Sequence, residues 1–213
     1  MNKVKTCGAA IECLDGALYP EEAAFVGQAV PGRKREFIAG RICARRALAE
    51  LGIAEAPLRV NADRTPDWPP GVVGSIAHTN NYCGVAVARV SDARGVGFDV
   101  ESVGDFRLEY LPKVCTRNEL LWLRRLAGEE QQKTGALIFS AKESFYKCQY
   151  AITKRWLGFH HVEVEPDSTG SNFGEFIATL LIDMQPAIER PFSVSGKYSF
   201  KDGLVMTGIT LRP

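Results

Sequence analysis

Two acidic side chains, Asp99 and Glu101, lie two positions apart in the segment Val96-Gly-Phe-Asp-Val-Glu101. This segment is typical of a strand, in which residues i and i+2 share a face, so both carboxylates should point the same way. Carboxylates this close repel each other unless a cation lies between them. Magnesium prefers hard oxygen ligands and combines one or two carboxylates with substrate phosphates. An isolated D-x-E also occurs at exposed strand ends, so the magnesium interpretation needs support from elsewhere in the chain.

That support comes from a polar cluster in the segment Phe139-Ser-Ala-Lys-Glu-Ser-Phe-Tyr-Lys147, which we expect to be helical. Glu143 and Lys147 are spaced i, i+4 and therefore share a face of the helix. A surface salt bridge worth about 0.3–0.5 kcal/mol would explain this pair on its own. However, Lys142 and Ser144 lie beside them, between apolar positions of a helix that should pack on a sheet. The density of polar groups favours a functional cluster.

Candidate phosphate contacts lie earlier in the chain. His78 ends a predicted strand, where its imidazole could donate to a phosphate oxygen or simply cap the strand. In the predicted helix over residues 33–51, at about 100° per residue, Arg41 lies about 40° from Phe37 and within the apolar stripe. Arg33 lies about 40° on the other side. A charge directed toward a core needs a partner, so Arg41 requires either a buried acid or a bound phosphate.

Hydrophobic periodicity and turn residues predict the elements that hold these side chains. Helices are expected at residues 33–51, after the capping box Thr116-Arg-Asn-Glu119, and at residues 135–150. Strands are expected at residues 72–76, 84–90, 96–101, 192–200 and 204–211.

This order of elements predicts an α+β protein of two similar halves, each a helix packed on a small, mainly antiparallel sheet. We place the N-terminal half at residues 1–103, with the basic helix and Asp99 and Glu101. The C-terminal half is placed at residues 104–213, with the helix of Glu143 and Lys147 and the closing strands.

Composition narrows the class of protein. The chain has 213 residues and a formal net charge of +1, which argues against bulk nucleic-acid binding. Its first residues lack the apolar run of a signal peptide, and no apolar stretch approaches the ~20 residues that span a bilayer. Six scattered cysteines without a C-x-x-C pair are read as reduced thiols. We therefore expect a cytoplasmic protein that does not bind membranes. A small polyanion could meet the basic stretch Arg33, Lys34, Arg35, Arg41, Arg45 and Arg46.

Four segments, taken in order, resemble the enterobactin-synthase and surfactin-synthase type of 4'-phosphopantetheinyl transferase. They are Arg33-x-x-x-Phe37-x-x-Gly40-Arg41-x-x-Ala44-Arg45, Gly74-Ser-Ile-Ala-His78, Gly97-Phe-Asp99-Val-Glu101 and Phe139-Ser-Ala-Lys-Glu143-Ser-Phe-Tyr-Lys147. The last two are the specific motifs. The Trp68-Pro69 loop also looks like the enterobactin type.

The resemblance implies a holo-[acyl-carrier-protein] synthase activity. Such enzymes transfer the phosphopantetheine arm of coenzyme A to a serine of an apo acyl or peptidyl carrier protein and release 3',5'-ADP. They use Mg²⁺, with Mn²⁺ as an alternative. The resemblance also implies a pseudo-twofold fold that binds coenzyme A between its halves. One chain would then supply a complete site, so we expect a monomer.

The resemblance also implies roles for single residues. Asp99, Glu101 and Glu143 match the metal carboxylates, and Asp99 also belongs to the coenzyme A site. Lys147 matches a catalytic lysine near the pyrophosphate. Whether Glu143 is a metal ligand, the general base for the serine, or both, stays open.

The phosphate contacts implied by the resemblance are His78, Arg33, Arg41 and Arg64. Two positions depart from the family pattern. Ala77 stands where Ser or Thr is usual, so either one hydroxyl contact to coenzyme A is lost or a backbone N–H takes its place. Phe98 replaces a more usual aliphatic residue.

Two rival functions use the same residues differently. A magnesium-dependent phosphohydrolase acting on nucleotides would need the carboxylates but no carrier protein. A non-catalytic protein that binds coenzyme A or a carrier should lack the acids, whereas all three are present. The Trp-Pro loop points to the enterobactin synthase complex and siderophore synthesis, with nonribosomal peptide and polyketide synthesis as the other pathways expected to use this reaction.

Overall fold

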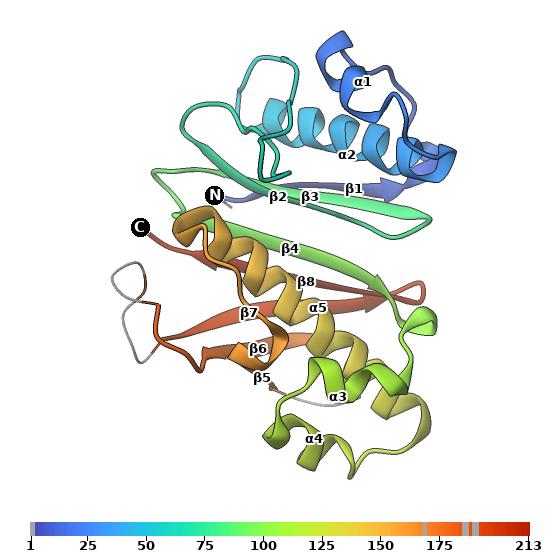
Figure 1. The fold of residues 1–213 in the computed structure, drawn as a ribbon, viewed down its shortest axis with the longest axis vertical. Coiled ribbons are helices and arrows are strands. Elements are labelled where there is room, and N and C mark those ends of the chain that lie inside the picture. The colour runs from blue at the N-terminus through green and yellow to red at the C-terminus, as the bar shows by residue number, and fades with distance from the viewer. Residues whose placement is uncertain (1–2, 168–169, 185–187, 189–191) are drawn as a thin grey trace. The chain divides into compact units, whose positions relative to one another are not determined.

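The computed structural model describes residues 3–167, 170–184, 188 and 192–213. The chain forms two compact units (Figure 1). We call Met1–Val96 with Arg212–Pro213 the N-terminal unit, and Gly97–Leu211 the C-terminal unit. Each unit contains a β-sheet packed against helices, which confirms the predicted α+β class.

The N-terminal unit is built on a three-stranded antiparallel sheet in the order β1-β3-β2. Its strands are β1 (Lys5–Ala10), β2 (Val72–His78) and β3 (Tyr82–Arg89). Its helices are α1 (Pro20–Val26), α2 (Pro31–Glu50) and the 3-10 turn η1 (Ile11–Cys13). Helix α2 covers one face of the sheet (Figure 1).

Small side chains allow α2 to lie close to this sheet. Ala39, Cys43 and Ala47 recur every four positions and are buried in one core with Val85 and Val87 of β3. The predicted helix over residues 33–51 is thereby confirmed, with slightly earlier bounds. Strand β1 escaped prediction because Lys5-Thr-Cys-Gly-Ala-Ala10 lacks bulky β-branched residues and clear alternation.

The C-terminal unit is built on a five-stranded sheet in the order β4-β8-β7-β6-β5. Its strands are β4 (Gly95–Ser102), β5 (Val162–Pro166), β6 (Phe173–Leu180), β7 (Phe192–Lys201) and β8 (Leu204–Leu211). Its helices are α3 (Leu111–Val114), α4 (Arg117–Leu123) and α5 (Gly128–Thr153), with the 3-10 turns η2 (Val103–Asp105), η3 (Leu108–Tyr110) and η4 (Phe159–His161). The long helix α5 packs mainly on β8.

Short sequence motifs, such as capping boxes and turn residues, predicted most of these elements. Thr116 and Glu119 form the predicted capping box, with the Thr116 side chain accepting from the Glu119 amide. Asp202 and Gly203 adopt positive φ in the tight turn between β7 and β8, as the hairpin signal predicts. Helix α5 begins at Gly128, earlier than the expected residue 135, because the polar run after Gly128 gave no apolar periodicity to read.

Strand β4 is hydrogen-bonded to β8, at one edge of the five-stranded sheet. Asp99 and Glu101 therefore lie in the same unit as Glu143, although they precede the midpoint of the chain. The division into halves at residues 103 and 104 stays a prediction. The N-terminal unit also contains a strand, β1, that the sequence did not predict and that precedes its helices.

A buried ion pair ties the small helices of the C-terminal unit to α5. Lys142 Nζ donates to Glu119 Oε2 at 2.7 Å, to the Val114 carbonyl oxygen at 2.8 Å and to the Phe159 carbonyl oxygen at 3.0 Å. Both side chains are almost fully buried. The other oxygen of Glu119 accepts from the Val164 amide at 2.7 Å. All three donors of the ammonium are thus satisfied, which makes this burial tolerable.

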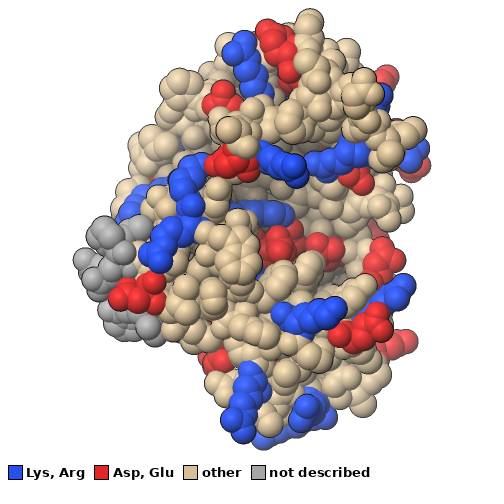
Figure 2. Space-filling model, viewed as in Figure 1, with Lys and Arg blue, Asp and Glu red and all other residues tan. Residues whose placement is uncertain are grey.

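Charge is mixed on the surface. On the face shown in Figure 2, basic and acidic side chains are interspersed, in line with the formal net charge of +1. None of the described helices combines the length and apolar character that crossing a membrane requires.

Replacing Lys142 by Met should strongly destabilise the chain, because it leaves the Glu119 carboxylate buried without its cation. We expect the free energy of unfolding in urea to fall by about 3–5 kcal/mol. The double variant Lys142→Met/Glu119→Gln, which removes both charges, should recover much of that loss. Equal losses in the single and double variants would contradict the assignment of the pair as one coupled unit.

Candidate active site

The site in the C-terminal unit depends on how closely β4 approaches α5. Gly97 makes this approach possible, because a Cβ at this position would collide with the Ser144 carbonyl oxygen and with Cys148. A methyl group there would force the strand and helix apart, at a cost of about 1–3 kcal/mol. The next residue of β4 on the same face as Gly97 is Asp99. The glycine therefore brings the Asp99 carboxylate to the helix that carries Glu143 and Lys147.

Asp99 and Lys147 form the central contact of the site. Lys147 Nζ donates to Asp99 Oδ1 at 2.5 Å. The Asp99 side chain is 3% exposed and that of Lys147 is 27% exposed. The second oxygen, Asp99 Oδ2, is buried and has no hydrogen-bond partner. A buried carboxylate oxygen without a donor is costly, and it is the kind of atom that a cation can satisfy.

The two other predicted carboxylates are electrostatically coupled to Asp99. Burial, followed by the charge of Asp99, raises the pKa of Glu101 to about 8, with Lys147 opposing and Glu143 adding to the shift. Burial also raises the pKa of Glu143, which Lys147 opposes and Asp99 reinforces. Burial alone would lower the pKa of Lys147, but the carboxylates, led by Asp99, outweigh it and raise that pKa.

These three acids lie close enough for Asp99 to raise the pKa of the other two. In the part of the chain that the structure describes, no three Asp, Glu, His or Cys side chains converge on one metal position. The donor set nevertheless fits a hard divalent cation, because it offers three carboxyl groups and one buried oxygen that lacks a partner. Sequence reasoning placed Asp99, Glu101 and Glu143 together but missed the Asp99–Lys147 pair and the role of Gly97. Gly97, two residues before Asp99, is the sequence feature that could have indicated a close approach of this strand to a helix.

The predicted phosphate contacts of the N-terminal unit include one compact group. Arg33 Nη1 lies 2.7 Å from His78 Nε2, which brings together two of the expected residues. Arg41, by contrast, is buried and already has partners. Its Nε donates to the Leu58 carbonyl oxygen at 3.1 Å, and its guanidinium stacks 3.8 Å from the centroid of the Phe37 ring.

Burial lowers the pKa of Arg41 to about 10, so this residue remains charged at neutral pH. The charge of the buried Glu22 opposes this lowering of the Arg41 pKa, so a buried acid lies near Arg41 besides the carbonyl oxygen and the aromatic ring. The Nη groups of Arg41 are the part left to serve a phosphate. Arg64 is exposed in the loop before β2 and has a positive φ of 66°. Such a conformation is uncommon for a residue other than glycine.

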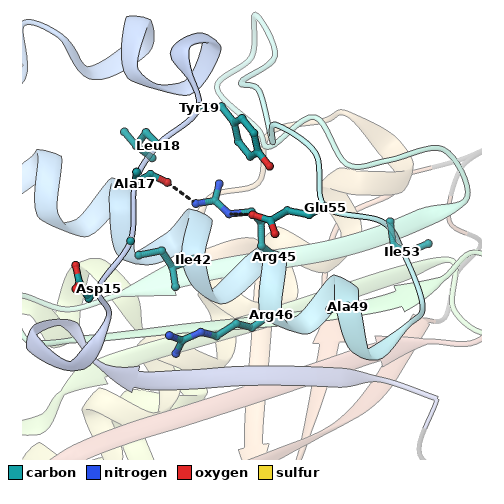
Figure 3. Close-up of a pocket in the computed structure, with 11 residues that line it drawn as sticks. Asp15, Ala17, Leu18, Tyr19, Ile42, Arg45, Arg46, Ala49, Ile53 and Glu55 are labelled. Atoms are coloured by element: carbon teal, nitrogen blue, oxygen red, sulfur yellow. Dashed lines mark hydrogen bonds and ion pairs between the residues drawn. The ribbon is translucent and has the colours of Figure 1, made fainter.

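The basic stretch of α2 also contains a structural arginine. Arg45 Nη1 contacts Glu22 Oε2 at 2.9 Å, Nη2 donates to the Ala17 carbonyl oxygen at 2.7 Å, and Nε lies 3.4 Å from Glu55 Oε1. Figure 3 shows the guanidinium held between Ala17 and Glu55 at a cavity of about 530 Å³. With these partners, Arg45 fixes the segment before α1 against α2, which accounts for its burial without a ligand.

A smaller cavity, of about 200 Å³, lies beside the carboxylate cluster in the C-terminal unit. Glu143 and Lys142 contribute to its wall. The rest of its lining is largely apolar and aromatic: Phe145, Tyr146, Trp156, Leu157, Gly158, Phe159 and Val162. A charged reacting group at Glu143 and an uncharged segment beside it could thus be bound together.

Glu101 should make stability fall as pH rises. Its folded pKa of about 8 exceeds the unfolded value near 4.3, so the folded state retains a proton that the unfolded state loses. The free energy of unfolding, measured in urea without divalent cations, should therefore decline between about pH 4.5 and 8. Glu101→Gln should remove part of that decline and stabilise the chain at pH 8.5 by about 1 kcal/mol, a figure reduced for solvent screening.

The matched control is Glu129→Gln, which changes an exposed carboxyl on α5 and should follow the wild-type pH profile. If the Glu101→Gln and wild-type profiles ran parallel across this range, Glu101 would not hold a raised pKa in the folded chain.

Comparison with known proteins identifies the family. The family model "4'-phosphopantetheinyl transferase N-terminal domain" matches residues 21–88, and "4'-phosphopantetheinyl transferase superfamily" matches residues 95–189. The 4'-phosphopantetheinyl transferase Svp of Streptomyces mobaraensis is 40% identical over 199 residues, which cover 91% of this chain and 78% of the relative. PptT of Mycobacterium tuberculosis is 37% identical over 195 residues, covering 90% and 85%. Enterobactin synthase component D of Escherichia coli K12 is 34% identical over 140 residues, covering 64% of each chain. The chain therefore belongs to the 4'-phosphopantetheinyl transferase superfamily and is an enzyme that transfers 4'-phosphopantetheine to carrier proteins.

Proposed function

We propose that this enzyme moves the phosphopantetheine arm of coenzyme A to a serine of an apo acyl or peptidyl carrier protein, in a magnesium-dependent reaction that releases 3',5'-ADP. The observation that carries the proposal is the buried Asp99 carboxylate. One of its oxygens is paired with Lys147, and the other lacks a partner beside two carboxyls of raised pKa.

Asp99, Glu101 and Glu143 are the residues that would hold the cation. A bound Mg²⁺ would neutralise the pyrophosphate of coenzyme A and help to align it for displacement. Manganese suits the same oxygen ligands. At neutral pH Glu101 is largely protonated in the free enzyme, because its pKa is about 8. Loss of the Glu101 proton would therefore favour binding of the cation.

The serine hydroxyl of the carrier attacks the β-phosphorus of coenzyme A, and the bond from that phosphorus to the oxygen of the α-phosphate breaks. Phosphoryl transfer depends mainly on position and on stabilisation of charge. Lys147 remains cationic, because the surrounding carboxylates raise its pKa. Its ammonium is suited to stabilise the negative charge that develops on the departing 3',5'-ADP.

Glu143 is our candidate for the group that accepts the serine proton. Burial raises its pKa toward the operating pH, which makes a carboxylate a better base than one exposed to water. Glu143 also lines the cavity of the C-terminal unit, where a reacting group could reach it. A tight metal ligand and a free base are different tasks for one carboxylate.

The remaining parts of coenzyme A fit the other described groups. Arg33 and His78 offer adjacent donors for phosphate oxygens, and the exposed Arg64 and the Nη groups of Arg41 are further candidates. The apolar lining of the cavity beside Glu143 suits the uncharged pantetheine portion. Arg45 is not part of the proposed coenzyme A site, because its guanidinium already contacts Glu22 and the Ala17 carbonyl oxygen.

Carrier proteins of siderophore, nonribosomal peptide or polyketide synthesis are the proposed acceptors, and a single chain is the proposed working unit. The similarity to enterobactin synthase component D supports the siderophore assignment. Comparing modification rates across a panel of apo carriers from these pathways would select among them.

The direct test is to incubate the enzyme with coenzyme A, Mg²⁺ and an apo carrier. Mass spectrometry should show one phosphopantetheine arm added to the carrier, together with released 3',5'-ADP. Glu143→Gln should reduce turnover by at least about a hundredfold, the range expected of a general base, while coenzyme A binding is retained. The matched control Glu129→Gln should turn over normally.

Two outcomes would contradict the proposal. Free phosphopantetheine without a modified carrier would indicate hydrolysis instead of transfer. Near-normal turnover by Glu143→Gln would exclude Glu143 from the chemistry.

A further inference from the structure

Glu36 lies against both members of the Arg33–His78 pair. Its Oε2 is 3.2 Å from Arg33 Nη1 and 3.6 Å from His78 Nδ1. On the far side of the imidazole, His78 Nε2 is 2.7 Å from the same Arg33 nitrogen. The carboxylate thus contacts one ring nitrogen while the arginine contacts the other.

The exposed fraction of the side chain decreases from Arg33 through His78 to Glu36. Arg33 is 51% exposed, His78 is 28% exposed and Glu36 is 19% exposed. An incoming anion would therefore meet Arg33 first and Glu36 last. Arg33 and Glu36 are spaced i, i+3 on α2, and His78 ends β2. The helix and the strand fix the geometry of the group without a ligand.

This arrangement determines what His78 can offer to an anion. Arg33 can only donate, so Nε2 of a neutral His78 must accept and its proton must lie on Nδ1, toward Glu36. If a phosphate replaces the imidazole as the acceptor of Arg33, Nε2 must gain a proton before it can donate to that phosphate. A carboxylate at Nδ1 favours the doubly protonated imidazolium.

We propose that Glu36 is a positioning residue of the phosphate subsite, which orients His78 through Nδ1 and holds Arg33 beside it so that both cations can bind one phosphate group of coenzyme A. This inference rests on the proposed function, which assigns Arg33 and His78 to coenzyme A. Glu36 is not among the site residues that the sequence predicts.

The charged groups around His78 are consistent with this role. Helix α2 contributes Arg33 and Glu36, while β3 places the buried thiol of Cys83 opposite His78 in the strand register. Without Glu36, an imidazolium would lie 2.7 Å from a guanidinium nitrogen and would be disfavoured by repulsion. The opposite role, in which Glu36 simply occupies the anion site and competes with phosphate, predicts an effect of opposite sign.

The test is Glu36→Gln, which keeps the shape of the side chain and removes its charge. KM for coenzyme A should rise about tenfold, the effect of losing one charge-assisted contact, while kcat at saturating coenzyme A changes less than about twofold. In ¹⁵N spectra of the wild-type chain, which has only three histidines, adding 3',5'-ADP should shift both His78 ring nitrogens to imidazolium values. In Glu36→Gln this shift should be lost.

The matched control is Glu50→Gln at the exposed end of the same helix, with His160 and His161 as internal references in the spectra. A lower KM in Glu36→Gln would overturn the inference in favour of competition, and unchanged KM and imidazole spectra would overturn it outright. If the wild-type enzyme did not modify a carrier with coenzyme A, the proposed function itself would fail, so the two failures are distinguishable.

Discussion

The candidate active site depends on one buried carboxylate. Asp99 is withdrawn from solvent on β4, and Lys147 neutralises only one of its two oxygens. Gly97 is the residue that allows this, because any side chain there would collide with the backbone of α5 at Ser144. The energetic cost of an unpaired buried oxygen must be offset by the packing around it. This unpartnered oxygen, which a cation could satisfy, is the feature on which the proposed magnesium site rests.

A second charge pair, Lys142–Glu119, is buried on the helix that carries Glu143 and Lys147. Lys142 immediately precedes Glu143 on α5, but its side chain is directed to Glu119 and to the carbonyl oxygens of Val114 and Phe159. Adjacent residues of one helix therefore have different tasks. Lys142 fixes α3, α4 and η4 to α5, whereas Glu143 is the proposed reacting group in the cavity whose wall both residues line. A similar division occurs on α2, where Arg45 has structural partners while Arg33 faces His78.

The sequence was sufficient to predict the α+β class, the helix of Glu143 and Lys147, and the pairing of Asp99 with Glu101 on one strand, because spacing alone determines which side chains share a face. It could not show that β4 joins β8, since strand pairing over about a hundred residues leaves no local signal. The same limit concealed the contact of Gly97 with α5 and that of Glu36 with His78. Angular position did identify Arg41 as directed toward the core, where it contacts the Leu58 carbonyl oxygen and the Phe37 ring and is stabilised by the charge of the buried Glu22.

Whether the three carboxylates hold a divalent cation is tested most directly by titrating the enzyme with Mn²⁺ and following the free ion by electron paramagnetic resonance, in the presence of 3',5'-ADP. The site described here predicts one bound Mn²⁺ per chain, competed by Mg²⁺, with affinity reduced at least about tenfold in Asp99→Asn. Binding of one Mn²⁺ with unchanged affinity in Asp99→Asn would contradict the assignment of this carboxylate as the centre of the site.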